Sequence, residues 1–192
     1  MRTSLDLSPE IGKHGRIAII GVGSDLRGDD AAGVEVIRGL RRRVRSSRVL
    51  LIEAGVAPEN FTSRIKRFRP TLIIVVDAAD FGGEPGETIS VEAEAVGGTP
   101  ISTHTMPISL LAEYLGEETG ARVIFLGVQP KEVGLGSRMS EEVQGSIKGI
   151  VDALAKMLRS HSRSSALGRG ARVIPKRPLT CRRRQARTPS SS

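Results

Sequence analysis

The residues best suited to chemistry lie in three short stretches, Gly-Asp-Asp, Val-Asp-Ala and Thr-His-Thr-Met-Pro, which carry Asp30, Asp77 and His104. An alternating strand and helix pattern places each stretch in a loop at one edge of a sheet. Parallel strands present their carboxyl ends at a common edge, so these side chains are expected to converge there. Oxygen and nitrogen ligands without cysteine suit a borderline divalent ion such as zinc or nickel. The sequence therefore predicts an open metal site.

Each residue taken alone also has a simpler interpretation. Asp30, together with Asp29, suits the N-terminus of a helix, where a carboxylate caps the chain and complements the helix dipole. Asp77 ends a buried apolar strand, so it needs a backbone amide, an arginine or a cation as its partner. Asp80 fits a turn, and a single His104 fits a surface or hydrogen-bonded histidine. Only the combination of Asp30, Asp77 and His104 favours a metal.

The elements that must position these residues follow from the hydrophobic pattern. Apolar runs predict buried strands at 16–23, 48–53, 71–77 and 122–127, and an alternating run predicts an edge strand at 87–92. Helical periodicity predicts helices at 34–44, 57–68, 107–115 and 140–158, the last capped by Ser140. Parallel neighbours need crossover helices. The pattern therefore predicts a single three-layer α/β domain, with a mostly parallel sheet between helices.

The charge distribution divides the chain into a neutral body and a basic tail. Ten of the 29 basic residues and none of the 21 acidic residues lie from Arg159 onward, which leaves a net charge of −2 for residues 1–158. Basicity is thus no argument that the body binds nucleic acid. We expect an N-terminal extension over 1–15, a folded domain over 16–159, and a basic disordered tail over 160–192.

The cellular compartment is predicted from cysteine use and from the lack of apolar runs. Cys181 is the only cysteine, so no intrachain disulfide can form, which is typical of a reducing compartment. No apolar run approaches the roughly 20 residues of a membrane helix. The segment Met1–His14 lacks the apolar stretch of a signal peptide. These features predict a cytoplasmic protein.

Other chemistry fits the sequence less well. Gly21-Val-Gly23 follows a strand, as in a dinucleotide site, but Leu26 replaces the third glycine and two aspartates would repel a pyrophosphate; tight-turn glycines explain the motif better. The nucleophile elbow and the zinc-protease helix motif are missing from the sequence, and Cys181 lies in the tail. The run Arg41–Arg43 is typical of a solvated helix face, with a docking patch for an acidic partner as the alternative.

The residues resemble the nickel–iron hydrogenase maturation endopeptidases, especially the branch that processes the large subunit of hydrogenase 3. The similar segments occur in order over about Ile17–Leu158, nearly the whole folded body. They are Gly21-Val-Gly-Ser, Gly28-Asp-Asp-Ala-Ala-Gly33, Glu53-Ala-Gly-Val-Ala-Pro-Glu-Asn60, Arg69-Pro-Thr, Val75-Val-Asp-Ala-Ala-Asp80, Pro85-Gly-Glu87, Thr103-His-Thr-Met-Pro107 and Val123-Ile-Phe-Leu-Gly-Val-Gln-Pro130.

The resemblance implies a single α/β domain with a twisted sheet, and a peptidase that is aspartic-type by family classification. It implies removal of the C-terminal extension of a hydrogenase large-subunit precursor after nickel insertion, and we expect the enzyme to be a monomer. The family's metal ligands fall on Asp30, Asp77 and His104, and Asp30 and Asp77 are the candidate catalytic carboxylates. Either the metal activates the carbonyl group or a bound water, or an aspartate acts as general base while the metal positions the substrate. Nickel is expected to arrive with the substrate, although other divalent ions can occupy the site in isolation. The ligands must be deprotonated, so binding should weaken on acidification.

Three alternatives stay open at this point. The same ligands could serve a non-catalytic nickel-sensing or chaperone module for hydrogenase assembly. The basic tail could bind RNA or DNA, with a steep salt dependence. The protein could also be the same kind of endopeptidase but process another type of hydrogenase.

Overall fold

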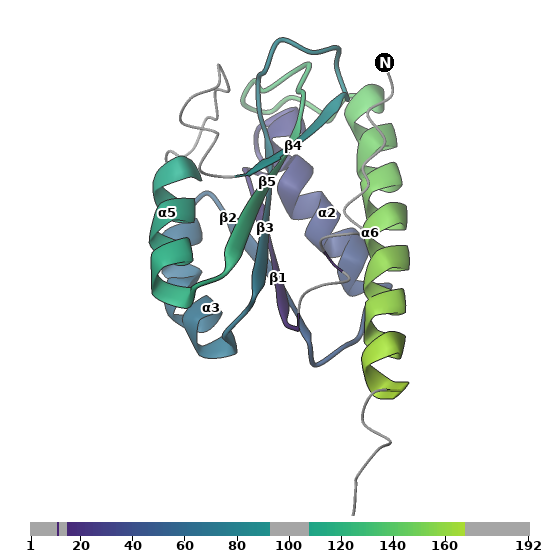
Figure 1. Ribbon diagram of the computed structural model, residues 1–192. Coiled ribbons are helices and arrows are strands. Elements are labelled where there is room, and N and C mark those ends of the chain that lie inside the picture. The colour runs from purple at the N-terminus through teal and green to yellow at the C-terminus, as the bar shows by residue number, and fades with distance from the viewer. Residues whose placement is uncertain (1–10, 12–14, 93–107, 168–192) are drawn as a thin grey trace, which may run out of the picture.

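The computed structural model describes residues 11, 15–92 and 108–167, and its helices and strands alternate along the chain (Figure 1). The strands are β1 (Ile17–Val22), β2 (Val49–Gly55), β3 (Leu72–Ala78), β4 (Thr88–Glu92) and β5 (Arg122–Val128). The α-helices are α2 (Ala32–Arg41), α3 (Thr62–Phe68), α5 (Ile108–Thr119) and α6 (Glu141–Leu167). Two short 3₁₀ helices, η1 (Gly28–Ala31) and η2 (Pro58–Phe61), precede α2 and α3.

The five strands form one sheet in the order β2-β1-β3-β5-β4. β1, β2, β3 and β5 run parallel, and β4 pairs antiparallel with β5 at the edge. β1 and β3 are buried along their whole length, as expected for strands covered on both faces. The five predicted strands, including the alternating edge strand, are therefore confirmed.

Helices cover both faces of the sheet. α2 and α6 lie on one side and α3 and α5 on the other (Figure 1). Each side has its own cluster of buried aliphatic side chains, one around Ile37 and Leu154, the other around Ile65 and Leu115. The predicted three-layer α/β architecture is confirmed. In the described part of the chain, no helix combines the length and apolar character needed to cross a membrane.

Both ends of the body differ from the sequence prediction. α6 continues to Leu167, so residues 160–167 belong to this helix and the predicted start of a disordered tail at 160 is wrong for them. His161 is buried on α6 although the polar composition around it shows no helical stripe. Ile11 is 1% exposed and packs in the core cluster of α2 and α6, so the predicted extension over 1–15 contributes to the core. Residues 168–192 lie outside the described residues, and their disorder stays a prediction.

Candidate metal centre and active site

Two glycines allow α2 to lie directly on the strand ends. A Cβ atom added to Gly33 would lie 2.1 Å from the Val76 carbonyl oxygen and 2.4 Å from that of Val22. One added to Gly21 would lie 2.1 Å from the Gly33 carbonyl oxygen. These separations are far below any contact distance, so only glycine permits the approach. It brings the Gly-Asp-Asp turn of η1, just before α2, against the end of β3.

Gly23, in the turn after β1, also allows η1 to lie close to the strand ends. Gly23 has φ of +125°, and a Cβ there would lie 1.7 Å from the Asp30 carbonyl oxygen. The backbone of η1 therefore fills the space beside this turn. The tight-turn explanation of Gly21-Val-Gly23 is supported, and the dinucleotide hypothesis is not.

Asp30 is positioned by this turn with one carboxylate oxygen satisfied and the other not. The side chain is 3% exposed. The Ser24 backbone N–H donates to Oδ2 of Asp30 at 3.0 Å. Oδ1 is buried, with no hydrogen-bond partner among the described residues. A buried carboxylate oxygen without a donor is unfavourable unless another group completes its environment.

Asp77, at the end of β3, repeats this pattern. Its side chain is fully buried, and Oδ1 accepts a hydrogen bond of 2.8 Å from the Ala78 N–H. Oδ2 is buried without a partner in the described part of the chain. Burial raises the pKa of Asp77 well above its ordinary value, the negative charge of Asp30 raises the pKa further, and the Ala78 N–H opposes both effects. The two buried carboxylates therefore repel each other electrostatically.

The two carboxylates fit a cation in their donor chemistry. One orphaned oxygen on Asp30 and one on Asp77 are the hard ligands that a divalent ion would accept, and a cation would favour ionisation of both. The third predicted ligand, His104, lies outside the described residues. Within the residues that are described, no group of three His, Cys, Asp or Glu side chains gathers as a metal site. The structure thus brings together two of the three predicted site residues.

Asp29, next to Asp30, has a structural role that the sequence did not reveal. Its carboxylate is fully buried and accepts hydrogen bonds from the backbone N–H groups of Lys131 and Glu132 at 2.8 and 2.9 Å. The Ser140 N–H and hydroxyl donate to the same carboxylate, at 2.7 and 2.9 Å. Asp29 therefore fastens the loop after β5, and the start of α6, to η1.

The predicted helix-capping use of the aspartate pair is wrong. Neither η1 nor α2 has a side-chain cap hydrogen bond. The intervening 3₁₀ turn points the Asp29 carboxylate toward the loop after β5. It therefore accepts hydrogen bonds from N–H groups of that loop and not from those of α2. The Ser140 cap is present, because its hydroxyl accepts from the Val143 N–H at 3.4 Å. The adjacency of Asp29 to a candidate ligand was its only sequence signal.

A second organising residue at this edge is Gln129, which directly follows β5. Its amide oxygen accepts from the N–H groups of Phe81 and Gly83, at 2.9 and 3.1 Å. Its amide nitrogen donates to Oδ1 of Asp80 at 3.1 Å. Asp80 also accepts from the Gly82 N–H, which confirms the prediction of a turn residue. Gln129 therefore fixes the loop that follows Asp77.

An ion-pair network holds the loop between β1 and η1. The Arg38 guanidinium on α2 donates to Asp25 at 2.7 and 3.0 Å, to Glu35 at 2.7 Å, and to Glu53 on β2 at 2.6 and 3.0 Å. These carboxylates raise the pKa of Arg38. Asp25 adjoins Ser24, whose N–H binds the Asp30 carboxylate, so Arg38 supports the conformation of that loop.

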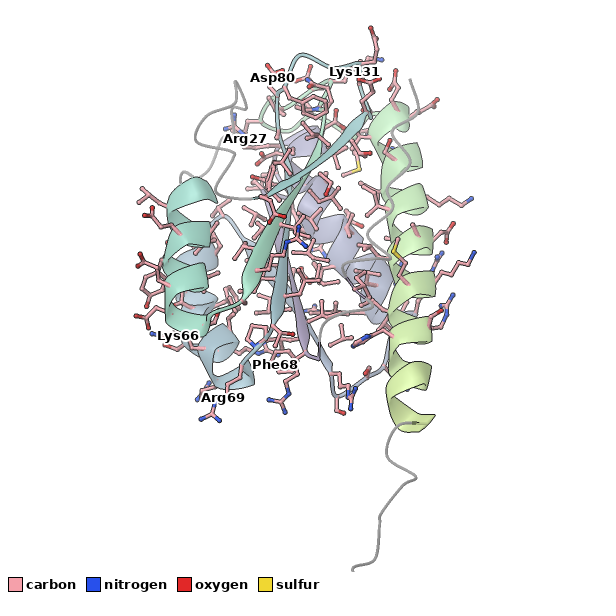
Figure 2. The ribbon with its side chains drawn as sticks, viewed as in Figure 1. Arg27, Lys66, Phe68, Arg69, Asp80 and Lys131 are labelled. Atoms are coloured by element: carbon pink, nitrogen blue, oxygen red, sulfur yellow. The ribbon has the colours of Figure 1, made fainter. Side chains whose placement is uncertain are left out.

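The side-chain view shows which end of the sheet carries the loops that follow the parallel strands. Arg27, Asp80 and Lys131 gather at one end of the sheet, and Phe68 and Arg69 lie at the other (Figure 2). The first three residues belong to the loops after β1, β3 and β5, which are parallel strands. The site therefore lies at the carboxyl edge of the sheet, as predicted.

Comparisons with known proteins agree on one family. The family model HycI, described as hydrogenase maturation protease, matches residues 34–157. The hydrogenase 3 maturation protease of Escherichia coli K12 is 34% identical over 134 residues, which cover 69% of this chain and 85% of that protein. The crystal structure of a NiFe hydrogenase maturation protease from Thermococcus kodakarensis matches with a TM-score of 0.75 at 36% identity, covering 80% of this chain and 98% of that one. The solution structure of an endopeptidase from E. coli matches with a TM-score of 0.66 at 30% identity, covering 73% and 90%.

Proposed function

Because the chain belongs to the hydrogenase maturation protease family, we propose that it removes the C-terminal extension of a nickel–iron hydrogenase large subunit after nickel has been inserted. The observation that carries this proposal is a pair of buried oxygens, one on Asp30 and one on Asp77, that have no hydrogen-bond partner among the residues that the structure describes. A structural carboxylate would have been satisfied within the fold, as Asp29 is. An unsatisfied pair is suited to a ligand that comes from outside.

In this proposal nickel belongs to the substrate. A precursor that already holds nickel would offer a cation to Asp30 and Asp77, and His104 is the third donor that the sequence predicts. A precursor without nickel would meet two buried carboxylates that repel each other. Processing would in this way depend on nickel insertion. Acidification should weaken recognition, because both carboxylates must be ionised to bind a cation.

Asp77 is the better candidate for the chemical step, in keeping with an aspartic-type classification. Its raised pKa brings its basicity closer to that of a general base working near neutrality. The ionised carboxylate would accept a proton from water at Oδ2 as the water oxygen bonds to the scissile carbonyl carbon. It would then give this proton to the amide nitrogen as the C–N bond breaks and the amine leaves. The substrate's nickel, when bound, supplies polarisation of that carbonyl or of the water. Asp30 would hold the cation.

The lone cysteine in the tail is compatible with a reducing compartment, so we place this activity in the cytoplasm. A monomer is sufficient for it, since Asp30 and Asp77 come from one chain.

The test is the intact mass of a purified nickel-loaded large-subunit precursor after incubation with the wild-type chain and with Asp30→Ala, Asp77→Ala and His104→Ala. We expect Asp77→Ala to lower kcat/KM by about a thousandfold or more. The control is Glu117→Ala, which removes an exposed carboxylate from α5, and this variant should cleave at the wild-type rate.

The outcomes separate the alternatives. Near-normal cleavage by all three variants would end the metal-site proposal. Precursor binding by the wild-type chain without any change of precursor mass would instead support a nickel-sensing or chaperone module. Loss of cleavage in Asp77→Ala with binding retained would assign the chemical step to Asp77.

A further inference from the structure

A groove of about 750 Å³ runs between α2, α6 and the loop that joins β5 to α6. Exposed basic side chains line it, among them Arg42, Arg138 and Lys148. Residues 1–158 carry a net charge of −2, so a local excess of cations is not a consequence of the body's composition. The positive charge of the groove is therefore a local feature that needs an explanation.

These three cations are available for a ligand. Among the described residues, no hydrogen bond or ion pair of their side chains is found. Their neighbours differ: Arg43 pairs with Asp152, and Arg38 pairs with Asp25 and Glu35, which also line the groove. The fold thus neutralises its other groove cations and leaves Arg42, Arg138 and Lys148 exposed.

The floor of the groove is apolar. Met139, Ile147 and Val151 line it and pack against the core cluster of α2 and α6. The two helices pack closely at Gly39, where an added Cβ would lie 2.7 Å from the Val151 side chain. A ligand that matches this surface combines negative charges with apolar side chains, as an amphipathic acidic peptide does.

The groove also borders the turn that carries the candidate site. Gly28 and Ala31 line it, and they flank Asp29 and Asp30 in η1. A polypeptide that lay in the groove would therefore contact the turn from which Asp30 projects. A nucleic acid fits less well, because Asp25 and Glu35 would repel a continuous phosphate backbone and no aromatic side chain of the lining offers stacking.

We propose that this groove between α2 and α6 docks an acidic, partly apolar segment of the large-subunit precursor. This proposal rests on the function proposed above. Carboxylates of that segment face Arg42, Arg138 and Lys148, and its apolar side chains contact Met139 and Ile147. Docking there raises the residence time of the precursor while its C-terminal segment occupies the site. The groove contributes to binding and takes no part in the chemical step.

The test compares a groove variant with a control of equal charge change. The groove variant is Arg42→Glu, Arg138→Glu and Lys148→Glu together. The control is Arg64→Glu, Arg67→Glu and Arg69→Glu on or next to α3, on the other face of the sheet (Figure 2 labels Arg69). Far-ultraviolet circular dichroism and thermal melting establish that both variants fold.

Steady-state cleavage of the nickel-loaded precursor is the main measurement. We expect the groove variant to raise KM about tenfold with kcat retained, because it loses binding that is the same in the ground and transition states. The salt dependence of kcat/KM should fall in the groove variant and persist in the control. A fluorescein-labelled peptide of alternating Glu and Leu gives a direct binding readout, with an alternating Lys and Leu peptide as its control.

Each outcome decides a different point. An unchanged KM in the groove variant, while the wild-type chain cleaves normally, overturns the groove proposal alone. Weaker binding of polyuridylic acid to the groove variant with an unchanged KM assigns the groove to nucleic acid and overturns the proposal as well. A wild-type chain that cleaves no precursor refutes the proposed function, and with it the precursor as the occupant.

Discussion

Two neighbouring aspartates, Asp29 and Asp30, show how one turn can serve both the fold and the site. Asp29 is buried with four donors on its carboxylate: two backbone N–H groups of the loop after β5, and the N–H and hydroxyl of Ser140. Asp30 is buried with a single donor, and one of its oxygens has no partner among the described residues. The fold completes the first carboxylate, whereas one oxygen of Asp30 and one of Asp77 have no partner in the described part of the chain, which is the basis of the proposed cation site.

The difference is energetic as well as geometric. A buried carboxylate with several N–H donors is stable in its ionised form, because these donors replace the water that was lost. Asp77 has one such donor and a charged neighbour, so burial raises its pKa. The same residue type is thus expected to stabilise the protein at Asp29 and to destabilise it at Asp77.

The largest effect on stability is expected at Asp29. Asp29→Asn should lower the free energy of unfolding by about 2–4 kcal/mol, because an amide has a single acceptor oxygen. Its NH₂ group would face the N–H groups of Lys131 and Glu132 in one orientation and the N–H of Ser140 in the other. Urea denaturation at neutral pH measures this change. Ser140→Ala, which removes a hydroxyl donor and the α6 cap, should cost about 1 kcal/mol. An Asp29→Asn variant as stable as the wild-type chain would refute the structural assignment.

An intermediate effect is expected from the close approach that brings η1 to β3. Gly33→Ala should lower the free energy of unfolding by about 1–3 kcal/mol, because the added methyl group overlaps the carbonyl oxygens of Val22 and Val76. Gly149→Ala on α6 is the matched control. Nothing lies within 4 Å of the added Cβ there, so it should raise stability by up to about 1 kcal/mol. Equal urea midpoints for the two variants would contradict this account.

The smallest effect should be a pH-dependent gain at Asp77. Asp77→Asn is expected to be more stable than the wild-type chain at neutral pH by about 1 kcal/mol or more, while it loses cleavage. Because burial raises the folded-state pKa of Asp77, the unfolded chain ionises first as pH rises, and the wild-type chain loses stability from its ordinary carboxyl pKa up to the folded value.

Urea denaturation across this range measures the pH effect without any metal present. The difference in unfolding free energy between Asp77→Asn and the wild-type chain should grow with rising pH and close in acid. A constant difference, or one that grows toward acid, would show that Asp77 is not held in its neutral form by the fold.

Much of the fold could be predicted because the core is aliphatic and its periodicity is regular. The apolar run from Leu72 to Val76 is buried on both faces, and the sequence predicts this from an unbroken hydrophobic strand. The end of α6 could not be predicted, since residues beyond Leu158 lack an apolar stripe although the helix continues to Leu167. The burial of Ile11 was equally invisible, because one apolar residue in a polar segment has no periodicity.

The sequence by itself determined the order of the strands and helices along the chain, the residue types at the carboxyl edge of the sheet, and the resemblance to one family. These depend on local hydrophobic pattern and on short motifs, which are properties of the chain. Tertiary structure alone decided that the Asp29 carboxylate finds donors in the loop between β5 and α6, whereas the donors to Asp30 and Asp77 are the nearby Ser24 and Ala78. The contact that joins Asp29 to Ser140 spans the longest stretch of sequence. A hydrogen-bond partner that far along the chain is set by how the layers pack, and no local pattern encodes it.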